Sequence, residues 1–161
     1  MSKKVYLAAD LGASSGRVIA GIYDGSSLQL AEVHRFHNGV SEEGESLRWD
    51  VTGLFDEICE VVRKAGETYG TSIVSMGVDT WGVDYGLLDA DGELIENPFA
   101  YRDSRTDGMM EEADRRMPKR EVYEITGIQF MFFNTLFQLV SETMANREAW
   151  GRADKLLFTP D

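Results

Sequence analysis

Three short apolar runs at the start of the chain constrain its fold more than any other feature. They are KVYLAAD (4–10), RVIAGIYD (17–24) and LQLAEVHRF (28–36), and only a few residues separate each run from the next. Apolar runs of this length, rich in β-branched residues, are typical of strands. Connections this short favour a reversal of direction between neighbouring strands. The sequence therefore predicts three sequential antiparallel strands.

The pattern changes to a helical period after Asp50. Asp50 or Thr52 is available as the N-cap, and the helix is expected to end near Gly70. The following apolar residues recur at helical spacing and indicate the helix: Leu54, Phe55, Ile58, Val61, Val62, Ala65 and Tyr69. SIVSMGVD (72–79) then predicts another buried strand, and the Asp-Gly pair within VDYGLLDADGEL (83–94) predicts a chain reversal.

The second half of the chain is less regular. Residues 107–126 predict two short helices separated near Pro118, and an apolar pattern from Phe133 to Met144 predicts an amphipathic helix. KLLFTP (155–160) begins a further strand, and the chain stops directly after it. Natural domains rarely end at the first residues past a buried strand, so we expect residues 1–161 to be one incomplete amino-terminal domain of a longer protein.

Composition limits the classes of function. A net charge of −12 disfavours extended nucleic-acid binding, although a small anion can still bind through local backbone donors. No run approaches the length of a membrane span, and the first ten residues lack the apolar segment of a signal peptide. We therefore expect a soluble cytoplasmic protein without a membrane partner. Cys59 is the only cysteine, so it forms no intrachain disulfide, and we expect it on the buried side of its helix.

The turn within ADLGASSGR (9–17) is the first candidate site. A glycine-rich turn binds phosphate by removing side chains so that several backbone N–H groups converge on the anion, while serine hydroxyls add donors. Gly12, Gly16, Ser14 and Ser15 meet that requirement. Asp10 would lie beside the phosphates, where a carboxylate is tolerable if a cation such as Mg²⁺ lies between them. The structural alternative is a polar hairpin turn, and the motif alone leaves both interpretations open.

A second candidate lies in VDTWGVDYG (78–86), where Asp79 and Asp84 flank Trp81 and a glycine at the end of a predicted strand. Sugars bind in such places by stacking their C–H faces on an aromatic ring while carboxylates and amides contact the hydroxyls. The alternative makes Trp81 a core residue, Asp79 a cap and Asp84 part of a solvated turn. AYRDSRT (100–106) and GIQFMFFNT (127–135) add charged and amide side chains to otherwise ordinary segments.

These segments, in this order, resemble the amino-terminal part of the FGGY family of carbohydrate kinases. The blocks that carry the resemblance are ADLGASSGR, HRFHNG, GVDTWGVDYGLLD, AYRDSRTDG, GIQFMFFNT and the terminal TPD. The resemblance implies a mixed α/β fold of the ribonuclease-H-like type, as in actin, heat-shock ATPases and hexokinase. Two such domains would close on ATP and sugar, and this chain would be the truncated first one.

The resemblance also implies the site. The cofactors would be ATP and Mg²⁺, and the partner a small sugar. Asp10 would hold Mg²⁺ through water, and Gly82 would touch the sugar. The residues expected near the ATP phosphates are Asp10, Gly12, Ala13, Ser14, Ser15, Gly16 and Arg17, and the further sugar-pocket candidates are Trp81, Arg102, Asp103 and Asn134.

The implied reaction is ATP-dependent phosphorylation of L-rhamnulose at its 1-hydroxyl, and another ketose or deoxy sugar is the alternative substrate. The catalytic base would be an aspartate beyond residue 161, so this chain is expected to be inactive by itself and to self-associate through exposed apolar surface. Two other classes stay open. One is a non-catalytic sugar- or nucleotide-binding module of the same fold, and the other is a hydrolase that uses Asp79 and Asp84.

Overall fold

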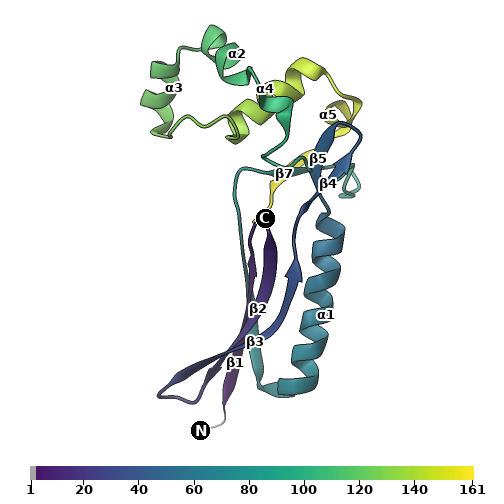
Figure 1. The fold of residues 1–161 in the computed structure, drawn as a ribbon, viewed down its shortest axis with the longest axis vertical. Helices are drawn as coiled ribbons and strands as arrows, with labels where there is room; N and C mark the ends of the chain where they lie inside the picture. Colours follow the sequence, from purple (N-terminus) through teal and green to yellow (C-terminus); the bar gives the residue numbers. More distant parts are fainter. Residues whose placement is uncertain (1–2) are drawn as a thin grey trace. The chain divides into compact units, whose positions relative to one another are not determined.

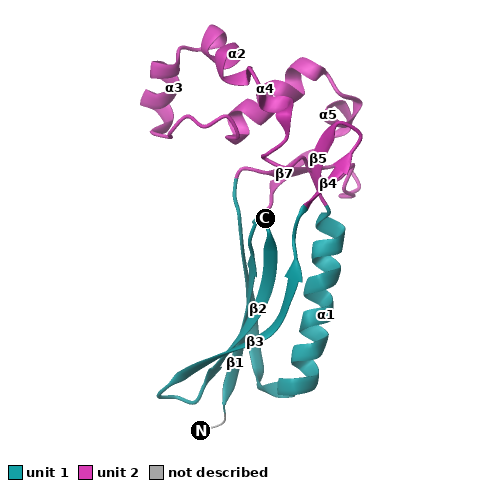
Figure 2. Cartoon of the chain, in the orientation of Figure 1, with its two compact units in different colours: residues 1–39, 50–82, 160 teal, residues 40–49, 83–159, 161 magenta. Residues whose placement is uncertain are grey.

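A computed structural model describes residues 3–161, which form two compact units (Figure 2). Unit 1 contains residues 1–39, 50–82 and 160, and unit 2 contains residues 40–49, 83–159 and 161. The chain thus passes from unit 1 to unit 2 and back before it crosses again at Val83. Each unit has secondary structure of its own. The expectation that residues 1–161 are one incomplete domain stays a prediction.

Unit 1 is a mixed four-stranded sheet with the order β3-β2-β1-β6 and one long helix along a face of the sheet (Figure 1). β2 pairs antiparallel with β1 and β3, and β6 pairs parallel with β1, which confirms the three predicted antiparallel strands. The elements are β1 (Lys4–Leu11), β2 (Ser15–Tyr23), β3 (Leu28–His37), α1 (Val51–Tyr69), the 3-10 turn η1 (Gly70–Ser72) and β6 (Ile73–Thr80).

Alternation along β1 creates the core of unit 1. Val5, Leu7 and Ala9 are buried and pack with Val61 and Ala65 of α1, while the residues between them on β1 face the other side of the sheet. Burying one such aliphatic side chain contributes roughly 1.5–3 kcal/mol. The predicted N-cap of the helix is confirmed, because the Asp50 carboxylate accepts a hydrogen bond of 2.9 Å from Gly53 N.

Two expectations about burial in unit 1 are wrong. The buried stripe of α1 is narrower than the apolar pattern, since Phe55 is 64% exposed and Val62 is also exposed. Cys59 is exposed rather than on the buried side of the helix. β6 exists as predicted, but Val74 and Val78 on it are more than half exposed. Within residues 3–161, the apolar pattern therefore predicted correctly whether a segment is a helix or a strand. It did not predict which apolar side chains are buried.

Unit 2 combines two small antiparallel sheets, β4–β5 and β7–β8, with short helices. The two helices on either side of Pro118, the helix after Phe133 and the strand at 155 are confirmed, whereas the β4–β5 hairpin and α5 were not foreseen. The elements are β4 (Val40–Glu43), β5 (Ser46–Trp49), β7 (Tyr85–Leu88), the 3-10 turn η2 (Ser104–Thr106), α2 (Met109–Arg116), α3 (Lys119–Thr126), α4 (Thr135–Ala145), α5 (Glu148–Arg152) and β8 (Lys155–Phe158).

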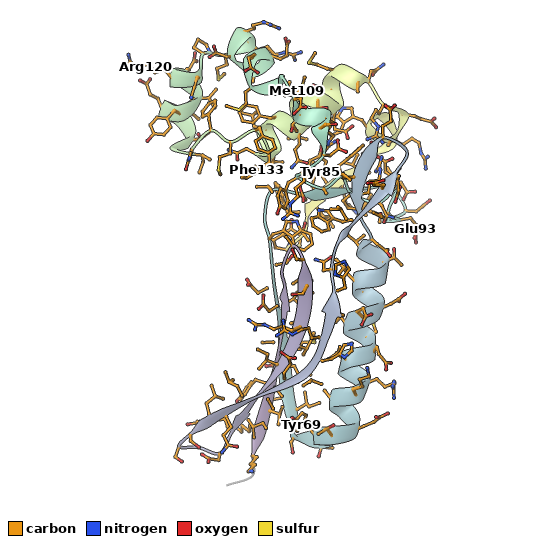
Figure 3. The ribbon with its side chains drawn as sticks, viewed as in Figure 1. Tyr69, Tyr85, Glu93, Met109, Arg120 and Phe133 are labelled. Carbon is orange, nitrogen blue, oxygen red and sulfur yellow. The ribbon has the colours of Figure 1, made fainter. Side chains whose placement is uncertain are left out.

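The surface of unit 2 mixes charge with apolar side chains. Arg120 of α3 extends away from the ribbon into solvent (Figure 3), and Tyr123 and Ile125 of the same helix are also exposed. Within residues 3–161, no helix combines the length and apolar character that a membrane crossing requires.

Candidate functional site

The turn between β1 and β2 has a defined backbone geometry. Gly12 N donates to Ser15 O at 3.0 Å, which closes the turn within itself. Asn38, at the end of β3, then holds it from outside: its side-chain Nδ2 donates to Gly12 O at 2.6 Å, and its backbone N donates to Ser14 O at 3.2 Å. Asn38 is only 3% exposed, so these contacts are shielded from water. Sequence reasoning missed this residue, although it lies within the HRFHNG block.

A side chain at Gly12 and one at Gly16 would meet different neighbouring atoms. A Cβ on Gly12 would lie 3.1 Å from Ser15 O, within the turn itself. A Cβ on Gly16 would overlap the Cε2 and Cζ atoms of Phe36, its cross-strand neighbour on β3. Gly16 is buried, while Ser14 is exposed and Ala13 is half-buried. The backbone from Gly12 to Ser14 is thus the part of the turn that an anion can approach.

A row of charged residues crosses the sheet directly below this turn. Arg17 donates from Nε to Asp10 Oδ2 at 2.9 Å and also contacts it through Nη2 at 2.8 Å. The strand registers place Arg35 opposite Arg17 and Asp79 opposite Asp10. Cross-strand neighbours share one face of a sheet, and here it is the face opposite the core. The hydrogen bond with Arg35 holds the pKa of Glu32, on the same strand, below its usual value.

Asp10 fits the kind of magnesium site that relies on phosphate and water. Both contacts from Arg17 use Oδ2, which leaves Oδ1 of a half-exposed carboxylate without a contact from residues 3–161. No cluster of three or more acidic, histidine or cysteine side chains suitable for a metal occurs in the same range. Mg²⁺ is usually bound through one or two carboxylates together with substrate phosphates and several waters. The single carboxylate of Asp10 beside the Gly12–Ser15 turn would meet that description if the turn binds phosphate.

The end of β6 supplies the next candidates. Asp79 and Gly82 are exposed, and a Cβ on Gly82 would meet no atom within 4 Å. Trp81 is half-buried and packs against the apolar cluster of Leu11, Phe36 and Leu54 under the turn. Its role as a core residue and a role as a stacking platform are compatible, because part of the side chain remains accessible.

Asp84 is not part of a solvated turn, which corrects that alternative. Its side chain is 0% exposed. Oδ2 accepts from Trp49 Nε1 at 2.6 Å and from Tyr101 N at 3.2 Å, and Oδ1 accepts from Gln138 Nε2 at 2.9 Å. A carboxylate whose two oxygens are buried and already bonded to the protein is poorly placed to exchange a proton with a substrate. The hydrolase hypothesis therefore loses one of its two carboxylates.

The sugar-pocket candidates of unit 2 occupy unlike environments. Asp103 is 3% exposed, and its two oxygens accept from Leu47 N at 2.6 Å and Arg105 N at 2.8 Å. Arg102 is exposed and lies near the Tyr101 ring. Asn134 is half-buried at the N-cap of α4, where its Nδ2 donates to Gln129 O at 2.8 Å. Asp103 is therefore the least accessible of the three to a ligand hydroxyl.

An apolar hollow of about 360 Å³ opens beside Asn134. Its walls include Val83, Val122 and Thr126, together with Phe130 and Met131. The hollow is large enough for a small organic group, and Asn134 and Thr135 are the polar side chains at the start of α4 that line it.

A charged network with alternating signs surrounds Phe99 in unit 2. The guanidinium carbons of Arg48, Arg105 and Arg147 lie 3.8, 3.9 and 4.6 Å from the centre of its ring. Glu142 accepts from Arg105 at 2.7 Å and from Arg147 at 3.0 Å, while Glu96 contacts Arg48 and Arg147. Sequence reasoning gave Arg105 no role and missed Glu142, which is buried on α4.

The mixed sheet of unit 1 agrees with what comparison with known proteins finds. The chain belongs to the FGGY family of carbohydrate kinases, whose N-terminal domain model matches residues 5–161. It is 42% identical over 158 residues to a rhamnulokinase of Ligilactobacillus salivarius and 44% identical over 159 residues to one of Bacteroides thetaiotaomicron. Those matches cover 98% and 99% of this chain but 32% and 33% of the relatives. The chain thus spans about a third of the length of the curated relatives it matches.

Solved structures confirm the predicted fold class. A gluconate kinase from Lactobacillus acidophilus superposes with a TM-score of 0.81 at 16% identity, over 97% of this chain and 31% of that one. A ligand-bound xylulose kinase from the same organism gives a TM-score of 0.79 at 17% identity, over 95% and 31%. At such identities the likeness concerns the fold alone. It confirms a mixed α/β fold with a mixed sheet.

Proposed function

We propose that the full-length protein to which this chain belongs transfers the γ-phosphoryl group of ATP to the 1-hydroxyl of L-rhamnulose. The observation that carries the proposal is the Gly12–Ser15 turn, held in shape by Asn38 beside the Asp10–Arg17 pair, in a chain 42–44% identical to rhamnulokinases. The activity is assigned to the whole protein, which we place in the cytoplasm.

The turn would bind the ATP phosphates. The backbone N–H groups of Ala13 and Ser14, the exposed Ser14 hydroxyl and the Arg17 guanidinium are donors suited to phosphate oxygens. Asp10 would hold Mg²⁺ through water. When bound, Mg²⁺ would neutralise phosphate charge. The ion pair between Asp10 and Arg17 would hold the Arg17 side chain in place beside it. Preorganised donors of this kind contribute most of the rate in phosphoryl transfer, together with alignment of the reactants.

The chemical step balances without a nucleophile from the protein. The sugar 1-oxygen forms a bond to the γ-phosphorus as the bond from that phosphorus to the bridging oxygen of ADP breaks. The hydroxyl proton passes to a carboxylate, which we place on an aspartate outside residues 1–161. Asp84 is unsuited to this role because it is buried and bonded to Trp49 and Gln138.

Sugar binding is assigned to residues that the family resemblance singles out. Gly82 offers exposed backbone, and the accessible part of Trp81 offers an apolar face. Arg102 and Asn134 would contact hydroxyl groups, whereas the burial of Asp103 limits the access of a hydroxyl to its carboxylate. A 6-deoxy ketose combines hydroxyls with a methyl group, which suits a surface where amide and apolar groups alternate.

The reaction is tested with the full-length protein in an ADP-release assay coupled to NADH oxidation. L-rhamnulose, D-xylulose, D-gluconate and glycerol are compared at equal concentration with ATP and Mg²⁺. We expect the highest kcat/KM with L-rhamnulose and a 1-phosphate product by phosphorus–proton NMR correlation. A higher kcat/KM for another substrate would overturn the assignment of the sugar, and turnover of none would overturn the proposal.

The phosphate site is tested by Asp10→Asn. We expect the variant to need far more Mg²⁺ for half-maximal activity while its KM for sugar changes little. Asp24→Asn is the matched control, because Asp24 lies in the exposed turn at the other end of β2 and bonds only to Ser26 and Ser27 among the residues described. Equal Mg²⁺ dependence in both variants would argue against a metal at Asp10.

The 161-residue chain alone should form no sugar phosphate above background. General-base assistance is typically worth about two to four powers of ten, and closure around bound substrates contributes as well. Sugar-dependent ADP release by this chain would require a base among its own residues.

A further inference from the structure

Arg35 lies beside the Gly12–Ser15 turn and has no part in the function proposed above. It is opposite Arg17 of β2 in the strand register, and His37, two residues further along β3, is opposite Ser15 of the turn. Cross-strand neighbours have Cβ atoms about 4.5–5.5 Å apart and share one face of a sheet. All these residues belong to unit 1. Arg35 and Arg17 therefore extend side by side from one face of the sheet, next to the turn.

A carboxylate holds each of these two guanidinium groups by the same edge. Arg35 donates to Glu32 from Nη2 at 2.6 Å and from Nε at 3.4 Å. Arg17 contacts Asp10 through its Nε and Nη2 atoms as well. A guanidinium has more N–H donors than one carboxylate accepts in this way. The Nη1 group of each arginine thus keeps its donors for a further acceptor, since no contact to it occurs within residues 3–161.

The two arginines are like charges on neighbouring strands, an arrangement that is unfavourable unless negative charge lies close by. Glu32 and Asp10 supply part of that charge. The hydrogen bond and the charge of Glu32 raise the pKa of the Arg35 guanidinium, and the charge of Asp10 adds to this effect. The Arg17 and Arg35 side chains are 42% and 49% exposed, so an anion from solvent can reach both.

We propose that Arg35 is a second phosphate-binding arginine, which donates from Nη1 to a phosphate group of the nucleotide bound at the Gly12–Ser15 turn, beside Arg17. The inference rests on the proposed function for its ligand. It adds a residue of β3 to a site otherwise built from β1, the turn and β2. Charge-assisted N–H···O bonds from arginine to phosphate are among the stronger hydrogen bonds of proteins, and Glu32 would hold the Arg35 side chain while it makes one.

Binding of ATP to the full-length protein, measured by isothermal titration calorimetry with Mg²⁺ present, tests the proposal. Arg35→Gln removes the charge and the Nη1 donors, so it should raise the Kd for ATP roughly tenfold. Arg35→Lys keeps the charge and should recover part of the affinity. Arg63→Gln is the matched control, because Arg63 is an exposed arginine of α1, on the opposite face of the sheet, and pairs with Glu60 and Glu67. Its Kd for ATP should equal that of the wild type.

The salt dependence of ATP binding separates a phosphate contact from a merely structural role. Dissolved ions screen the attraction between an exposed arginine and phosphate. Added NaCl should therefore weaken ATP binding by a smaller factor in Arg35→Gln than in the wild type, while the melting temperatures of Arg35→Gln and Arg63→Gln stay alike. A wild-type Kd in Arg35→Gln, an equal rise of the Kd in Arg63→Gln, or an unchanged salt dependence would overturn the inference.

The titration contains no sugar, so failure of the proposed function is distinguishable from failure of this inference. If the wild-type protein binds ATP but phosphorylates none of the sugars, the proposed function falls, and the comparison of Arg35→Gln with Arg63→Gln still decides the role of Arg35. If the wild type phosphorylates L-rhamnulose and Arg35→Gln binds ATP normally, the inference alone falls. Absence of ATP binding by the wild type would overturn both.

Discussion

Replacing Gly16 by alanine tests whether the candidate site is built on tight packing. Gly16 is in a strand, where alanine is ordinarily more stable than glycine by roughly 0.5–1 kcal/mol. Here the new Cβ would overlap two atoms of the Phe36 ring, and Phe36 is buried against Leu11 and Leu54. The ring cannot swing freely into solvent. Overpacking of this kind typically costs about 1–3 kcal/mol, so the expected sign is destabilising.

The assay is urea unfolding followed by circular dichroism, with thermal melts in parallel. For a chain of this size, each kcal/mol corresponds to roughly 2–4 °C, so Gly16→Ala should lower the melting temperature by several degrees. Gly66→Ala is the control of opposite sign, because Gly66 is an exposed glycine within α1 whose Cβ would meet no atom within 4 Å. Gly66→Ala should raise the free energy of unfolding by roughly 0.5–1 kcal/mol.

A companion substitution attributes the effect to the ring. Phe36→Leu removes the overlapping atoms, so the cost of Gly16→Ala should shrink in that background, with a coupling energy of about 0.5–3 kcal/mol. Stabilisation by Gly16→Ala in the wild-type protein would refute the packing argument. A destabilisation that is the same in both backgrounds would place its cause elsewhere in the turn.

Three further predictions concern separate features. Asn38→Ala should raise the KM for ATP more than that for sugar, because the Gly12 carbonyl loses its side-chain donor; Asn97→Ala, whose Nδ2 bonds to Glu43 in unit 2, should not. Burial raises the pKa of the Tyr85 phenol above its ordinary value of 10.0, so the wild-type free energy of unfolding should fall as pH rises above about 10, and urea titrations of Tyr85→Phe should show a smaller fall. Val78→Lys on β6 should reduce self-association measured by light scattering, because an exposed apolar edge strand invites pairing; an unchanged mass would exclude that strand as the contact.

The sequence predicted element types well where local signals were strong. The three antiparallel strands follow from short connections, and α1 follows from its period and from the Asp50 cap. Cys59 was placed on the wrong side because a wide apolar stripe does not reveal which part of it meets the sheet, and Phe55 in the same stripe is exposed as well. The β4–β5 hairpin was missed because its four-residue strands carry polar residues around Gly44.

Among the candidate site residues, too, some were recognisable from local sequence and others were not. The Gly12–Ser15 turn was recognisable as a candidate because residue types suited to phosphate binding lie within one short stretch, and that role stays a prediction. Asn38 and Gln138 were not, since each acts on backbone far away in the sequence. Asp84 resembled a ligand-binding acid until its partners were known, and these come from β5, Tyr101 and α4. Long-range contacts of this kind leave no local pattern to read.

The charged network around Phe99 has a consequence for how the protein can change over evolutionary time. Each arginine in it shares a glutamate or the ring with another, so replacing one residue leaves a partner of unbalanced charge in a largely buried place. Breaking a buried pair from one side commonly costs about 3–5 kcal/mol, whereas exchanging both partners for apolar residues can be neutral. Glu142 and its two arginines should therefore vary together among descendants of this sequence, by joint replacement rather than by independent drift.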